Sequence, residues 1–136
     1  MDKVLKLEEL AMTVMGIYLL TFNQLGIPVW IWFILFFAPD VSMLGYLFNA
    51  KVGSISYNVF HHKGIAIAIA AVGYFMNADV VLSAGILLFA HASFDRVFGY
   101  GLKYYQGFNV THLGVLRGAK NGNEHLSSKS MGKPLA

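Results

Sequence analysis

The sequence predicts an all-α integral membrane protein built as a four-transmembrane-helix bundle. Of its 136 residues, 57% are hydrophobic and only 12% are charged. A water-soluble domain carries about 25% charged residues, so this chain lacks the charge to cover a water-facing surface. Polar turn residues divide the apolar sequence into four stretches, each close to the length of about 20 residues that crosses a bilayer.

The first two expected spans are joined by a tight turn. The first span covers residues 7–25, and Gly26 and Pro28 mark the turn that follows it. The second span begins at residue 27 or 28 and reaches Pro39 after only about 13 residues, too few to cross a bilayer alone. We therefore expect the second helix to be kinked or broken near Pro39-Asp40, so that the chain either continues to Asn49 or re-enters the membrane.

A loop at residues 49–53 leads into the second half of the chain, where a turn at 77–79 separates two more spans. Three segments complete the membrane domain: the third span (52–76), the fourth span (80–100) and an aromatic, basic segment at the membrane interface (101–117). The membrane domain therefore covers residues 1–117. The polar residues 118–136 are expected to form a disordered cytoplasmic tail.

Basic residues indicate the orientation of the spans. Lys and Arg side chains fall at one set of span ends: Lys3, Lys6, Lys51, Lys63, Arg96, Lys103, Arg117 and Lys120. Because cytoplasmic loops carry an excess of Lys and Arg, we expect a multi-pass protein of the cell membrane with both termini in the cytoplasm. The lipid bilayer is its expected partner. No basic-aromatic groove motif points to nucleic acid, and the lack of cysteine excludes disulfides and thiol catalysis.

Four ionisable side chains lie within the apolar spans, where charge is costly and usually faces a bundle interior or a water-filled cavity. His91 and Asp95 are four residues apart, so they share one face of a helix. Counting 1.5 Å per residue from the outer turns places Asp40 and His91 at about 18 Å, His61 at about 22 Å and Asp95 at about 24 Å. In a core about 30 Å thick, all four belong to the cytoplasmic half. This convergence from three spans predicts one shared polar site.

The residue types in this layer indicate metal chemistry. Two imidazoles and two carboxylates match a ligand set for Zn²⁺, Mn²⁺ or Fe²⁺. The expected metal ligands are Asp40, His61, His91, Asp95 and, reaching back from the interfacial segment, His112. A metal there would activate a water as a nucleophile, with Asp40, His91 and Asp95 as the catalytic residues of a hydrolase-like enzyme. The expected substrate is a lipid or another amphipathic anion, bound by five residues: Asn58, Arg96, Tyr100, Lys103 and Thr111.

Several motifs resemble one family of small bacterial integral-membrane proteins. They are FAPDVSMLGY (37–46), YNVFH (57–61), HASFDRVFGYGLKY (91–104) and THLG (111–114). The family is catalogued as domain of unknown function 4260, and the likeness covers nearly all of residues 7–117. The resemblance implies a four-helix membrane protein and no particular activity. It marks nine signature positions: Asp40, Asn58, His61, His91, Asp95, Arg96, Lys103, Thr111 and His112.

Other interpretations of the polar layer stay open. It can fix helix register in a non-catalytic scaffold or binding protein. It can be the relay of a small proton-coupled transporter, which with only four spans would act as a homodimer. It can also hold haem, with His61 and His91 as axial ligands. The Ala38-Pro39-Asp40 element is loosely similar to membrane-bound metal-dependent hydrolases, which carry a second acidic residue where Val41 stands here.

Overall fold

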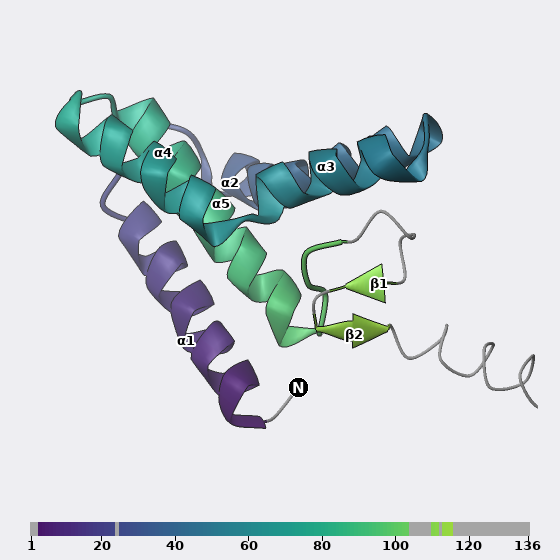
Figure 1. Cartoon of the computed structure of the whole chain (residues 1–136). Coiled ribbons are helices and arrows are strands. Elements are labelled where there is room, and N and C mark those ends of the chain that lie inside the picture. Colours follow the sequence, from purple (N-terminus) through teal and green to yellow (C-terminus); the bar gives the residue numbers. More distant parts are fainter. Residues whose placement is uncertain (1–2, 24, 104–109, 112, 116–136) are drawn as a thin grey trace, which may run out of the picture.

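Figure 1 shows the computed structural model, which describes residues 3–23, 25–103, 110–111 and 113–115. Within these residues the chain is helical apart from one very short strand pair. The helices are α1 (Lys3–Leu20), α2 (Val29–Phe37), the 3₁₀ helix η1 (Ala38–Leu47), α3 (Ala50–His61), α4 (Lys63–Phe75) and α5 (Asp79–Val97). Strands β1 (Val110–Thr111) and β2 (Gly114–Val115) pair antiparallel beyond the end of α5. The expected tail, 118–136, and His112 lie outside the described residues.

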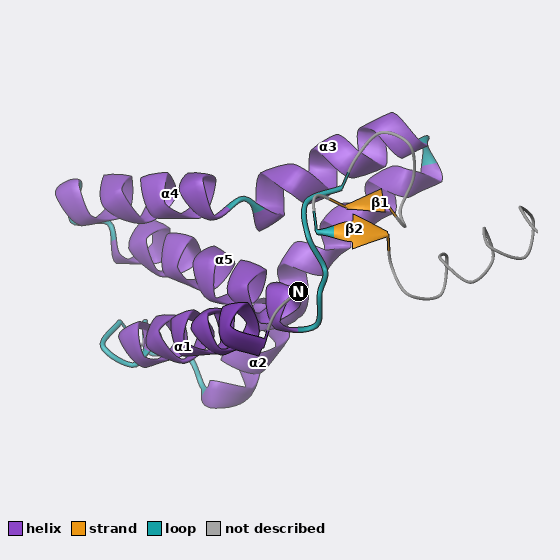
Figure 2. Ribbon diagram, turned by 60° about the horizontal axis from the view of Figure 1, so that its bottom comes forward, coloured by secondary structure: helices purple, strands orange, loops and turns teal. Residues whose placement is uncertain are grey.

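The helices form two packing units that meet at α5. In the first, α5 lies between α1 and α4, as both views show (Figures 1 and 2). Small residues bring these backbones together, because a Cβ added at Gly85 would lie 2.3 Å from the backbone nitrogen of Ala70 in α4. A Cβ added at Gly16 of α1 would lie 2.7 Å from the Cβ of Ala90. In the second unit, α3 packs on η1 as a hairpin that projects away from the other helices (Figure 1).

The second apolar helix changes character at Pro39, as the sequence predicts. The α-helix ends at Phe37, and the chain continues in 3₁₀ geometry from Ala38 to Leu47, with Pro39 in the first turn. Proline lacks the backbone N–H that an α-helix would use at this position. The chain stays helical after Asp40 and does not turn back before Leu47. A 3₁₀ run of this length is uncommon, because most are only three or four residues long.

The prediction of one unbroken helix over residues 52–76 is wrong. The chain breaks at His62, whose ψ of 110° is extended, and this residue ends α3 and begins α4. The imidazole Nδ1 of His62 accepts a hydrogen bond from the backbone N–H of Ile65 at 3.3 Å, so the side chain caps α4. A side chain that accepts a hydrogen bond from a nearby backbone N–H replaces the backbone bond of a continuous helix, and so favours a new helix start. The break lets His61 and Lys63 point to different neighbours.

Other boundaries differ by a few residues. The first helix covers Lys3–Leu20 instead of residues 7–25, and the last ends at Val97 instead of residue 100. Residues 50–53, expected in a loop, form the first turn of α3. The cause is Asn49, whose side-chain Oδ1 accepts a hydrogen bond from the N–H of Val52 at 2.8 Å.

Two helical segments among the described residues have the length and apolar composition to cross a membrane. They are Val29–Leu47, which combines α2 and η1, and Asp79–Val97, which is α5. Helix α4 is apolar but shorter, and four of the first seven residues of α1 are charged. The architecture is therefore an α-helical fold with two candidate membrane spans.

Candidate functional site

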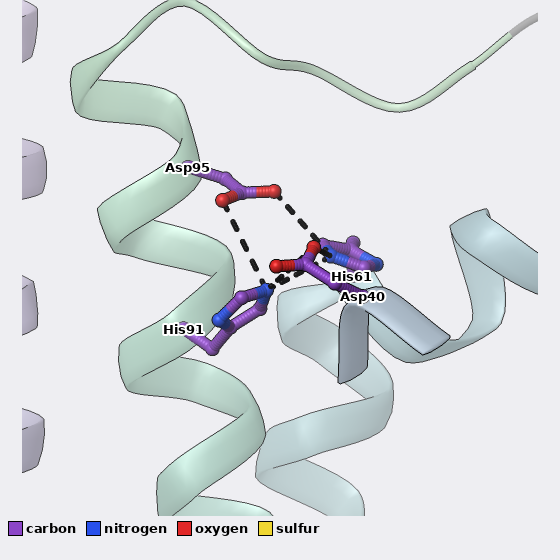
Figure 3. A group of neighbouring side chains, drawn as sticks. All are labelled: Asp40, His61, His91 and Asp95. Atoms are coloured by element: carbon purple, nitrogen blue, oxygen red, sulfur yellow. Dashed lines mark hydrogen bonds and ion pairs between the residues drawn. The ribbon is translucent and has the colours of Figure 1, made fainter. Parts of the chain in front are cut away.

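Four side chains from three helices meet where the two packing units join (Figure 3). We call Asp40, His61, His91 and Asp95 the four-residue cluster. The Nε2 atoms of His61 and His91 lie 3.1 Å apart. Asp40 Oδ1 lies 3.5 Å from the first of these nitrogens and 3.3 Å from the second. Asp95 approaches the same nitrogens with its two oxygens, at 3.4 and 3.9 Å.

These distances have the size expected around one metal ion. Zn²⁺ bound by nitrogen and oxygen at 2.0–2.2 Å in a tetrahedron holds its ligand atoms about 3.3–3.6 Å from one another. The separations in the four-residue cluster range from 3.1 to 3.9 Å, and one ligand atom from each residue lies within 4.8 Å of all the others. The four predicted side chains therefore lie at a spacing that could hold one metal ion.

The hydrogen positions also favour a cation at the centre. The Nδ1 atom of His61 lies 2.9 Å from the carbonyl oxygen of Tyr57. Because a carbonyl oxygen only accepts hydrogen bonds, neutral His61 carries its hydrogen on Nδ1 and points the lone pair of Nε2 at the cluster. Only His91 can then supply an N–H hydrogen to three converging acceptors. A metal ion would accept all of these lone pairs. His61 donates its other N–H to a backbone carbonyl as metal-bound histidines typically do, whereas the buried Nδ1 of His91 has no hydrogen-bond partner among the described residues.

Tyr57 supports the cluster and was not among the residues that the sequence singled out. Its hydroxyl donates a hydrogen bond to Asp95 Oδ2 at 2.9 Å, and its ring stacks on the His61 ring with centroids 3.8 Å apart. Its carbonyl oxygen fixes His61 as described above. The available signal was spacing, because Tyr57 precedes His61 by four residues and so lies one helical turn away on the same face.

The cluster is enclosed on one side and open on the other. His91 is fully buried, with its ring edge-on to Phe36 at a centroid distance of 5.4 Å, and His61 is also buried. Asp95 is 16% exposed, whereas Asp40 is 40% exposed. Because Asp40 is the most exposed of the four side chains, a ligand approaching the cluster would arrive on its side.

The residues expected to bind an anion lie around the cluster and not within it. Asn58 makes two hydrogen bonds to the backbone of Lys103: its Nδ2 donates to the carbonyl oxygen at 2.7 Å, and its Oδ1 accepts from the N–H at 2.6 Å. The Lys103 ammonium lies 5.1 Å from the ring centroid of Tyr57 and 5.5 Å from that of Tyr100. Burial lowers the pKa of Lys103, an effect that the charge of Asp95 opposes.

Arg96 faces another part of the molecule. Its Nη1 lies 4.0 Å from Glu9 Oε1 of α1, and Lys63 of α4 also forms an ion pair with Glu9. We call Glu9, Lys63 and Arg96 the Glu9 cluster. The backbone of Thr111 belongs to β1, and the expected fifth ligand, His112, lies outside the described residues.

The distance between the two histidines argues against haem ligation by both of them. Two axial histidines bind iron from opposite faces of a planar macrocycle, with each nitrogen about 2 Å from the metal. At 3.1 Å, the Nε2 atoms of His61 and His91 leave no room for the macrocycle between them. The paired imidazoles therefore suit a single ion.

The comparisons with known proteins agree with the motifs. No curated protein and no solved structure matches this chain. One family model, described as a domain of unknown function (DUF4260), matches residues 2–116. That match covers nearly all of the described helices and the whole four-residue cluster, and the chain therefore belongs to the DUF4260 family.

Proposed function

We propose that this protein is a multi-pass membrane enzyme that uses a divalent metal ion, Zn²⁺, Mn²⁺ or Fe²⁺, to hydrolyse a lipid or another amphipathic anion. The observation that carries the proposal is the four-residue cluster, whose ligand atoms converge at metal-ligand spacing from three helices. Mixed imidazole and carboxylate ligands suit these three metals.

The proposed topology has four crossings with both termini in the cytoplasm. The turns after α1 and after α4 lie at the same end of the molecule (Figure 2), and neither contains Lys or Arg. At the opposite end of α5, Arg96 lies in the last turn of the helix and Lys103 follows it. This asymmetry supports a cluster near the cytoplasmic face of the bilayer, with residues 52–76 crossing as the broken helix α3–α4.

Hydrolysis follows from the chemistry that such a metal supplies, since it lowers the pKa of a bound water and polarises an ester or phosphoester oxygen. The protein residues have separate tasks. His61 and His91 hold the ion from the buried side, and Asp95 is oriented by the Tyr57 hydroxyl. Asp40 is partly exposed, so substrate and water would enter the site on its side. The buried ammonium of Lys103, above the ring of Tyr57, adds positive charge beside the cluster for an anionic head group.

Elemental analysis of protein purified without added metal tests the metal centre. We expect about one ion per chain in the wild type and none in His61→Ala. His62→Asn is the matched control, because it removes the adjacent imidazole and keeps a side chain that can cap α4. If wild-type protein and His61→Ala contain the same amount of metal, the four-residue cluster does not bind it.

Reconstitution tests the reaction. Wild-type and His61→Ala proteins in vesicles of total polar lipid extract are followed by mass spectrometry of the lipids. We expect a hydrolysis product that forms only with the wild type and stops when a chelator is added. Metal retained without any lipid turnover would contradict the enzyme and favour the non-catalytic scaffold.

A further inference from the structure

An apolar cleft of about 370 Å³ lies between α2 and α5, beside the four-residue cluster. Its volume is in the range of small-molecule sites, about 300–1,000 Å³. Trp32 and Leu35 of α2 line one wall, and Val80, Ala84 and Leu87 of α5 line another. The polar side chain in the lining, Ser83, already donates its hydroxyl to the carbonyl oxygen of Asn23 at 3.5 Å. The cleft therefore offers little to recognise a polar ligand.

The cleft leads to the metal ligands along two helices. Its residues on α5 follow helical spacing, 80, 84 and 87, and the next position on the same stripe is His91. On the other wall, the lining includes Pro39, the residue before Asp40. Phe60, the residue before His61, also contacts the cleft. Three of the four proposed ligands thus lie within one residue or one helical turn of the cleft lining.

The length of the cleft suits a chain and not a compact group. From Val80 to Leu87 the lining residues extend over about 10 Å of helix at 1.5 Å per residue. Both flanking segments, Val29–Leu47 and Asp79–Val97, are the candidate membrane spans, so the cleft lies at the depth of lipid chains. An open apolar cleft at that depth has alkyl chains as its immediate surroundings.

We propose that the cleft holds one alkyl chain of the membrane lipid whose polar group reaches the four-residue cluster. This inference rests on the proposed function and adds that the substrate is recognised by its chain as well as its head group. The chain lies between α2 and α5 with its head-group end near Leu87 and its far end toward Val80, and the head group meets the cluster on the side of Asp40.

Cobalt-loaded protein in detergent provides the first test, because Co²⁺ absorption reports ligands at the metal. Ethylphosphonate and decylphosphonate serve as probes with the same head group and different chains. Ala84→Trp and Leu35→Trp fill the cleft from its two walls, and Val72→Trp places the same side chain on an exposed position of α4. All proteins are compared at one detergent concentration, so that partition of decylphosphonate into micelles is equal.

We expect the cleft-filling variants to bind Co²⁺ and ethylphosphonate as the wild type does. They should bind decylphosphonate about tenfold more weakly than Val72→Trp, a loss equal to about two buried methylene groups. If either correctly folded cleft variant binds decylphosphonate as tightly as Val72→Trp, the chain does not occupy the cleft. Loss of ethylphosphonate binding together with decylphosphonate binding would also overturn the inference, because the head-group site would then have changed.

A second measurement does not depend on the metal. Wild-type protein is reconstituted in phosphatidylcholine vesicles that contain a diazirine-labelled acyl chain, irradiated and mapped by mass spectrometry. We expect labelling of Leu87, which is only 8% exposed, and its loss in Ala84→Trp. Labelling of Leu87 without Co²⁺ binding would contradict the proposed function and keep the chain site. Co²⁺ binding without labelling of Leu87 would contradict the chain site and leave the proposed function standing.

Discussion

Two clusters of charged residues lie on different faces of α5, and they are satisfied in different ways. In the Glu9 cluster, one carboxylate faces two cations, so each charge has an opposite charge beside it. In the four-residue cluster, two carboxylates and two imidazoles face one another, so each carboxylate has a positive charge beside it only where an imidazole is protonated.

The difference separates a structural cluster from a binding site. Burying charge is expensive unless it is paired, and the Glu9 cluster pairs its charges within the chain. It links α1, α4 and α5, the three helices of the first packing unit. In the four-residue cluster the carboxylates pair with the two imidazoles, which are cationic only when protonated, so the cluster can accept a metal ion in place of those protons. Removing metal should therefore change the four-residue cluster and leave the Glu9 cluster unchanged. Neutralising the charge of Glu9 should lower stability and leave metal affinity unchanged.

The largest effect is expected for His91→Gln, which keeps a polar side chain of similar length at the buried centre of the four-residue cluster. Losing a direct ligand should lower metal affinity by more than the 10–100-fold that follows loss of an outer-shell partner. Competition with a chromogenic chelator measures this change. Glu9→Gln serves as the control, and equal metal affinity in the two variants would remove the distinction between the clusters.

The next effect is expected for Tyr57→Phe, which keeps the ring stacked on His61 and removes the hydroxyl bound to Asp95. A freely rotating carboxylate binds the ion less well, so metal affinity should fall about 10–100-fold. The same chelator competition measures it. Tyr100→Phe is the matched control, since Tyr100 contacts Lys103 and not the cluster. An unchanged affinity in Tyr57→Phe would mean that Asp95 does not coordinate the metal.

The sequence was sufficient to identify the four proposed ligands for a physical reason. Ionisable side chains are rare inside apolar helices, and helical rise alone placed Asp40, His61, His91 and Asp95 at similar depth. Their contact in the structure needs only that the helices pack together. The change of helix at Pro39 was equally accessible, because proline acts on its own backbone and needs no tertiary partner.

Features that depend on tertiary contacts were not accessible in the same way. Arg96 was expected to bind an anionic substrate, and its partner Glu9, 87 positions earlier in the chain, could not be identified from spacing. The break at His62 depends on a side-chain cap that competes with a long apolar pattern. Tyr57 was not singled out from the sequence, and only the position of Asp95 gives its hydroxyl a role.

A smaller effect, confined to stability, is expected for Glu9→Gln. Removing its charge leaves Lys63 and Arg96, each less than one-fifth exposed, without the carboxylate between them. The free energy of unfolding should fall by about 1–3 kcal/mol, less than for a fully buried pair because these side chains are partly solvated. Thermal unfolding in detergent measures it. Glu8→Gln, one residue earlier, is the control, and an equal loss in both would show that the Glu9 cluster does not hold the three helices together.

The smallest effect is expected for Asn58→Ala, which removes both hydrogen bonds between α3 and the backbone of Lys103. At about 1 kcal/mol for each of the two bonds, local protection of the Lys103 amide against hydrogen exchange should fall roughly thirtyfold. Val59→Ala, at an exposed neighbouring position, is the control. Metal affinity should change little, because Asn58 contacts the segment above the four-residue cluster and none of its ligands. A loss of metal affinity as large as that of Tyr57→Phe would show that this segment closes over the ion and belongs to the binding site.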